Sequence, residues 1–132
     1  MNSRMYHQVE FTNELEIKLE KIATIAKKVA ASVTETYKQL FKELGVELFV
    51  NVYEPEKGWF NKDSELTIQI ALMEEGHLSD DEYIPIWMIE RKCFKPKGLL
   101  DFESELELVK ELEETIETLY STFETLNKSR LE

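Results

Sequence analysis

Residues 46–53 read VELFVNVY, and residues 66–72 read LTIQIAL. In both segments apolar and polar side chains alternate, and a period of two places successive side chains on opposite faces of a β-strand. A third apolar segment follows at about residues 83–94, where Pro85 places it at a strand start or on a sheet edge. Connections of about ten residues without a helical pattern favour antiparallel pairing over a parallel crossover. The middle of the chain therefore predicts a three-stranded antiparallel β-meander.

Apolar residues spaced by threes and fours flank this sheet on both sides, which is the pattern of amphipathic helices. The first helix is predicted over residues 15–44, with Asn13 as its N-cap. The second is predicted over residues 102–126, with either Asp101 or Ser104 as its N-cap. The order is then long helix, three strands, long helix.

This order predicts an α+β fold, αβββα, with both helices packed together on one face of the sheet. Residues 1–132 form a single domain in this interpretation, and residues 1–12 form a loose N-terminal segment. A long helix overhangs a short strand, so its apolar stripe needs a further cover. That cover is either the other helix, lying antiparallel, or a second copy of the chain. Both a monomer and a homodimer stay open.

The sheet face away from the helices is predicted to mix aromatic and polar side chains, which suits a protein interface. The first two strands contribute Phe49, Asn51, Tyr53, Thr67, Gln69 and Ala71. The third strand adds Trp87 and Ile89 if that parity faces outward. In the opposite parity Ile86 faces outward and the surface is an ordinary wet sheet face.

Two predicted loops supply the residues expected to bind a partner. Residues 54–63 place Trp59 and Phe60 side by side in a polar turn, either as partner anchors or folded back onto the domain. Residues 74–82 hold five acids, which either meet lysines and arginines of a partner or are merely solvated. These acids are Glu74, Glu75, Asp80, Asp81 and Glu82.

The chain carries a net charge of −11, and residues 101–132 alone carry 10 acids and 3 bases. A surface this negative repels nucleic acid and anionic lipid and speeds encounter with basic proteins. The predicted second helix adds a row of carboxylates that could stand in for phosphates or could simply face solvent. This row is Glu103, Glu107, Glu111 and Glu114.

Residues that carry chemistry are sparse. His7, His77 and Cys93 have no metal-ligand spacing, and Cys93 is interpreted as a strand residue. No catalytic motif, phosphate loop or dinucleotide fingerprint occurs, so we expect no enzyme, no cofactor and no metal. The chain has neither a signal-peptide core nor an apolar run long enough to span a membrane, which predicts a cytoplasmic protein without membrane contact.

The function these features favour is an acidic protein-binding module. Its most direct form is an inhibitor or immunity-type, antitoxin-like protein that neutralises a basic partner, such as a toxin or a nucleic-acid-handling enzyme. The alternative is a homodimeric secretion chaperone or adaptor that holds a client segment. In size, low pI and mixed α/β content the chain is similar to bacterial secretion chaperones, which typically carry more strands and a helix between strand groups.

Overall fold

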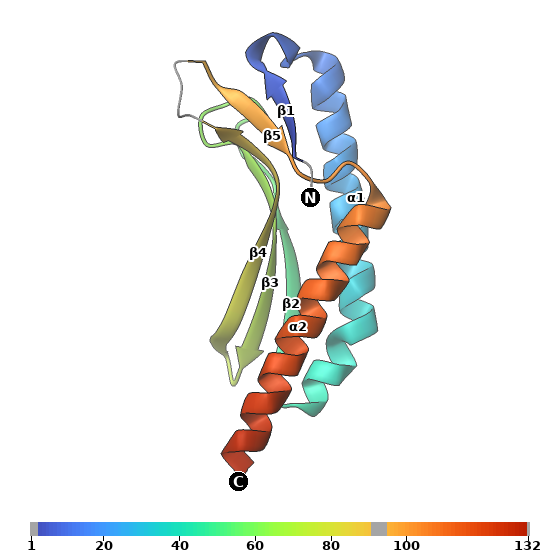
Figure 1. Ribbon diagram of the computed structural model, residues 1–132, viewed down its shortest axis with the longest axis vertical. Coiled ribbons are helices and arrows are strands. Elements are labelled where there is room, and N and C mark those ends of the chain that lie inside the picture. The colour runs from blue at the N-terminus through green and yellow to red at the C-terminus, as the bar shows by residue number, and fades with distance from the viewer. Residues whose placement is uncertain (1–2, 91–94, 132) are drawn as a thin grey trace.

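The computed structural model describes residues 3–90 and 95–131, with the side chains described up to residue 128. The end of the predicted third strand, including Cys93, lies outside these residues. Figure 1 shows a curved sheet along one side of the molecule and both long helices along the other. The elements are β1 Arg4–His7, the short 3-10 helix η1 Gln8–Glu10, α1 Asn13–Glu43, β2 Glu47–Tyr53, β3 Glu65–Glu74, β4 His77–Glu90, β5 Lys97–Leu100 and α2 Glu105–Leu131.

The sheet has five strands in the order β1-β5-β4-β3-β2, and all neighbouring strands run antiparallel. The predicted α+β class and antiparallel pairing are confirmed, whereas the three-strand meander is incomplete. In particular, the described part of residues 1–12 is not loose, because β1 pairs with β5 from Arg4 opposite Leu100 to His7 opposite Lys97.

Both helices begin at a side-chain cap. The Thr12 hydroxyl accepts a hydrogen bond from the Leu15 amide at 3.4 Å, so Thr12 rather than Asn13 is the N-cap of α1. The Ser104 hydroxyl accepts from the Glu107 amide at 3.2 Å, which resolves the open choice before α2 in favour of Ser104. Each cap satisfies an amide that lacks a partner within the helix.

The two helices run in the same direction rather than antiparallel. The Lys28 ammonium lies 3.3 Å from the Glu105 carboxylate near the start of α2, and further along Phe41 packs edge-on against Tyr120 at 5.4 Å. In Figure 1 both helices lead from the end that holds β1 and β5 toward the β3–β4 turn. The predicted antiparallel arrangement is therefore wrong, although each helix does cover part of the other.

The core lies between the sheet and the helices. On β3 the side chains that face the helices are all fully buried, and they are Leu66, Ile68, Ile70 and Leu72. Leu19 of α1 with Leu112 and Ile116 of α2 are equally inaccessible to solvent. Because burying one such side chain contributes about 1.5 to 3 kcal/mol, this layer is the main stabilising feature of the fold.

A β-bulge in β4 changes which residues face the core. The pairing of β3 with β4 shifts by one residue between Leu66 and Thr67, which leaves Ile86 as the extra residue on β4. Ile86 and its neighbour Trp87 are both fully buried. The bulge lets both side chains turn toward the core, whereas a regular strand places consecutive side chains on opposite faces. The parity that turned Trp87 outward is therefore wrong, and so is its alternative with Ile86 outward.

Candidate functional site

The aromatic loop between β2 and β3 does not present two exposed anchors. Trp59 is only 8% exposed, and its carbonyl accepts a hydrogen bond from the Trp87 indole N–H at 2.9 Å. Phe60 is half-buried and stacks on Phe11, with ring centroids 4.8 Å apart and an angle of 8° between the planes. The loop folds back and closes one end of the core, which is the second of the two predicted alternatives, and the alternative with two exposed anchors is not what the structure has.

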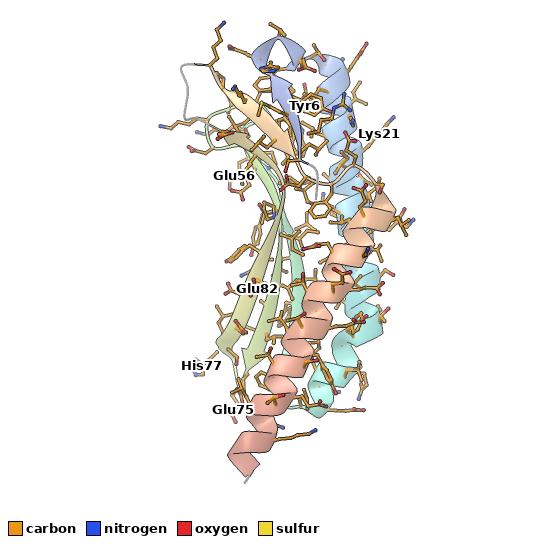
Figure 2. All side chains as sticks on the ribbon, in the orientation of Figure 1. Tyr6, Lys21, Glu56, Glu75, His77 and Glu82 are labelled. Atoms are coloured by element: carbon orange, nitrogen blue, oxygen red, sulfur yellow. The ribbon has the colours of Figure 1, made fainter. Side chains whose placement is uncertain are left out.

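Four of the acids predicted to share a loop lie instead on two paired strands, and the fifth, Glu75, lies in the turn between them. Glu75 and Gly76 have φ values of 51° and 80°, the conformation of a two-residue hairpin turn, and Asp80, Asp81 and Glu82 belong to β4. Figure 2 shows Glu75 and His77 at this turn, with Glu56 of the aromatic loop at the other end of the sheet.

The two predicted binding segments are therefore far apart. They are separated by the length of β3, which is about 30 Å at 3.3 Å per residue. The structure does not bring Trp59 and Phe60 together with the acids into one site, because the loop and the turn lie at opposite ends of the same strand.

The predicted carboxylate row of the second helix is also interrupted. Glu103 precedes α2, and its carboxylate lies 2.8 Å from the Lys18 ammonium and 3.2 Å from the Arg4 guanidinium. The hydrogen bond from Lys18 holds the pKa of the Glu103 carboxyl below its ordinary value. Glu103 thus ties β1 and α1 to the start of α2, where its charge is compensated.

A different set of residues forms a continuous surface, on the sheet face opposite the helices. We call this surface the open face. Three rows of paired residues cross it from β2 through β3 to β4. The rows are Phe49, Ala71 and Asp81; Asn51, Gln69 and Tyr83; and Tyr53, Thr67 and Pro85.

Gln69 is the centre of a hydrogen-bond network on the open face. Its side-chain oxygen accepts from the Tyr53 hydroxyl at 2.8 Å and from the Asn51 amide at 3.3 Å. Its side-chain amide donates to the Tyr83 hydroxyl oxygen at 3.2 Å and to the Asp81 carboxylate at 3.4 Å. Hydrogen bonding to Asp81 raises the pKa of the Tyr83 hydroxyl. The network holds side chains from three strands in fixed relative positions.

The aromatic side chains of the open face remain in solvent. Phe49, Tyr53 and Tyr83 are 41%, 52% and 56% exposed, whereas Thr67 and Ala71 between them are buried. The aromatic rings project further from the sheet than the small side chains of Thr67 and Ala71 and shield these from solvent. Such a surface offers aromatic contact area with hydrogen-bonding groups between the rings.

The sequence indicated part of this surface. Phe49, Asn51, Tyr53 and Gln69 follow from strand alternation alone, and the structure places all four on the open face. On β4, Asp81 was missed because the segment before Tyr83 was interpreted as a loop. The signal that could have identified it is the Glu-Gly pair at positions 75 and 76, which suits a two-residue hairpin turn. Tyr83 and Pro85 lay within the predicted third strand, for which the choice of outward face stayed open.

Comparison with protein-family models, with curated proteins and with solved structures finds no match for this chain. Within residues 3–90 and 95–131, no group of three or more His, Cys, Asp or Glu side chains could hold a metal ion. None of the helices in that part of the chain is long and apolar enough to cross a membrane.

Proposed function

We propose that this chain is an acidic protein-binding module that engages a basic protein partner through the open face of its sheet. An inhibitor or immunity-type protein is the form of this function that we favour. The observation that carries the proposal is the exposure of Phe49, Tyr53 and Tyr83 around the Gln69 network.

Exposed aromatic side chains held by hydrogen bonds favour binding for two reasons. Aromatic residues are the commonest anchors of protein interfaces, because they bury a large area with few rotatable bonds. Side chains that are already ordered lose less conformational entropy when a partner arrives. Tyr53 and Tyr83 meet both conditions through their contacts with Gln69.

The charge of the chain favours a basic partner. A net charge of −11 on 132 residues attracts a positively charged protein and raises its rate of association. The same charge opposes binding to nucleic acid or to an anionic membrane. Asp81 places one of these negative charges within the open face itself.

The proposal is tested by affinity purification from the native host with a matched pair of variants. Replacing Phe49, Tyr53 and Tyr83 together by Ala removes the aromatic surface. The control replaces Leu106 and Leu126, which are 80% and 52% exposed on α2, by Ala. We expect a basic protein to co-purify with the wild type and the control at low salt.

The expected affinity of the open-face variant is at least about tenfold lower. Moderate salt should also weaken capture of the basic partner, because dissolved ions screen the attraction between surface charges. Equal capture by the wild type and the open-face variant would contradict the proposal.

A homodimeric secretion chaperone or adaptor is the second candidate, and the number of strands favours it. Five strands rather than three bring the chain nearer to the coarse description of those chaperones. No helix of the described residues stands between strands of the β2–β5 group. Light scattering of the pure protein separates the candidates, because a monomer at high concentration argues against the chaperone.

A further inference from the structure

The sheet has an unpaired edge beside the open face. β5 pairs with β4 only from Trp87 to Glu90, while β3 pairs with β4 along its whole length. Residues 77–85 of β4 therefore have a neighbour strand on one side only among the described residues, whereas the Ile86 carbonyl already accepts a hydrogen bond from the Asp101 amide at 2.8 Å. We call this segment the β4 edge. It is long enough to receive another strand, since a typical strand has about five or six residues.

The β4 edge carries features that limit its pairing. Pro85 has no amide hydrogen and cannot donate to an added strand. The Asp81 amide donates to the carboxylate of Asp80 at 2.8 Å, so this donor is covered while no strand is present. Natural sheets use proline and charged residues in this way to prevent uncontrolled pairing of their edges.

The charges on the β4 edge decide which strand can pair there. Asp80 and Glu82 lie on the helix side, opposite Leu72 and Ile70 of β3, and Asp81 lies on the open face. A second copy of the chain that paired with this edge would set carboxylates beside carboxylates, which is destabilising. An apolar strand would bury the carboxylates without compensation.

A strand with lysine or arginine side chains meets neither penalty. Its side chains alternate between the two faces, so one row lies beside Asp80 and Glu82 and the other beside Asp81 and Tyr83. The exposed Tyr83 ring can also receive a cation over its face. Of a second copy of the chain, an apolar strand and a basic strand, charge complementarity therefore favours the basic strand.

We propose that the β4 edge binds an extended, lysine- or arginine-bearing segment of the partner as a sixth strand. This inference rests on the proposed function and adds the mode of recognition. Main-chain hydrogen bonds supply the pairing, as in other cases of strand addition, and the carboxylates select a basic sequence. The open face then contacts the rest of the partner next to the added strand.

The test uses a synthetic nine-residue peptide that alternates lysine with valine and threonine, titrated into the isotope-labelled protein and followed by NMR. We expect shifts of the amide signals of residues 78–85, with smaller changes along the neighbouring strand β3. A matched peptide of the same sequence carries N-methyl groups on consecutive backbone amides, so that the amides at both of its edges are blocked. It keeps the charge but cannot form a regular ladder, and we expect it to bind at least about tenfold more weakly.

The Asp80→Asn, Glu82→Gln variant should bind the unmodified peptide about fivefold more weakly, because two charge pairs are lost while shape is kept. Equal binding of the two peptides would overturn the inference, since it would show attraction by charge alone. Shifts confined to other surfaces, or no binding up to millimolar peptide, would overturn it as well.

Failure of this inference can be told apart from failure of the proposed function. If the proposed function is right and the inference wrong, the variant at Phe49, Tyr53 and Tyr83 loses the partner while the peptide leaves residues 78–85 unchanged. In the opposite case the peptide pairs with the β4 edge and the same variant keeps the partner.

Discussion

The aromatic side chains of the sheet and of the segments beside it form two groups that differ in their surroundings. At the end near β1 and β5, rings from β1, from the aromatic loop and from the segment just before α1 pack against Trp87, whose own exposure is zero. On the open face the rings are 41% to 56% exposed. The first group is Tyr6, Phe11, Trp59, Phe60 and Trp87, and the second is Phe49, Tyr53 and Tyr83.

The difference shows that the sheet face on which a strand side chain lies indicates its exposure, whereas position in a loop does not. The loop aromatics at 59 and 60 are needed to close the end of the core beside β1 and β5. The strand aromatics at 49, 53 and 83 have no element above them in the described structure. Aromatic residues in a polar turn are thus weak evidence for a binding site in a domain of this size.

The largest effect is expected at the centre of the buried group. Trp87→Ala removes a fully buried ring and its hydrogen bond to the Trp59 carbonyl, and should lower the free energy of unfolding by about 3 to 5 kcal/mol. Urea denaturation measures this loss. Tyr83→Ala on the open face is the matched comparison and should change stability by about 0.5 kcal/mol or less. Equal losses would contradict the distinction between the two groups.

A second effect comes from the close approach of β5 to the same ring. A Cβ at Gly98 would lie 2.6 Å from Cζ2 of Trp87, so Gly98→Ala should lower the free energy of unfolding by about 1 to 3 kcal/mol. In a Trp87→Leu background the same substitution should cost less, because the ring is gone. A double-mutant cycle from urea denaturation measures this coupling. Additive losses would show that the packing of Gly98 on Trp87 is unimportant.

The third effect concerns the border of the open face. Asp80→Thr with Glu82→Thr removes two carboxylates from the β4 edge and supplies side chains that favour strands. Self-association should strengthen by about 1 to 2 kcal/mol, because like charges no longer oppose each other. Sedimentation at increasing concentration detects it, and Glu107→Thr with Glu111→Thr on α2 is the control. If the variant stayed monomeric at all concentrations, these acids would not be what prevents self-association through the β4 edge.

The smallest effect is expected where β1 joins the helices. The pKa of Glu103 lies below its ordinary value of 4.5, first because Lys18 donates a hydrogen bond to the carboxylate. A lowered folded-state pKa contributes stability above the unfolded pKa, and this contribution is lost as the pH falls through the folded value. Since Glu103 is 42% exposed, Glu103→Gln should cost only about 0.5 to 1 kcal/mol at pH 7.

The pH dependence provides the check on Glu103. Wild type and Glu103→Gln, compared by thermal unfolding, should differ at pH 7 and converge well below pH 4.5. A difference that persists in acid would mean that the side chain acts through packing rather than charge.

Periodicity predicted the helices and the two central strands because their signals are long and local. β3 alternates over residues 66–72, and α1 and α2 have 31 and 27 residues. The same alternation predicted the part of the open face on β2 and β3. These features depend on neighbours close in sequence, which is what a pattern records.

The missed features depend on contacts distant in sequence. β1 and β5 have four residues each, too few for alternation to be recognised, and Arg4 pairs with Leu100 from the other end of the chain. The bulge at Ile86 interrupts the alternation of side chains along β4, so the sequence pattern does not show on which face of the sheet Trp87 lies. The local sequence does not indicate at which residue such a bulge occurs.

The most direct test of the account is site-specific cross-linking in the native host. A photoreactive benzophenone side chain replaces Tyr83 on the open face in one variant and Leu106 on α2 in another, since both positions are exposed, at 56% and 80%. We predict a cross-link to one basic protein from position 83 and none from position 106. A cross-link to that protein from position 106 alone would contradict the claim that the open face is the binding surface.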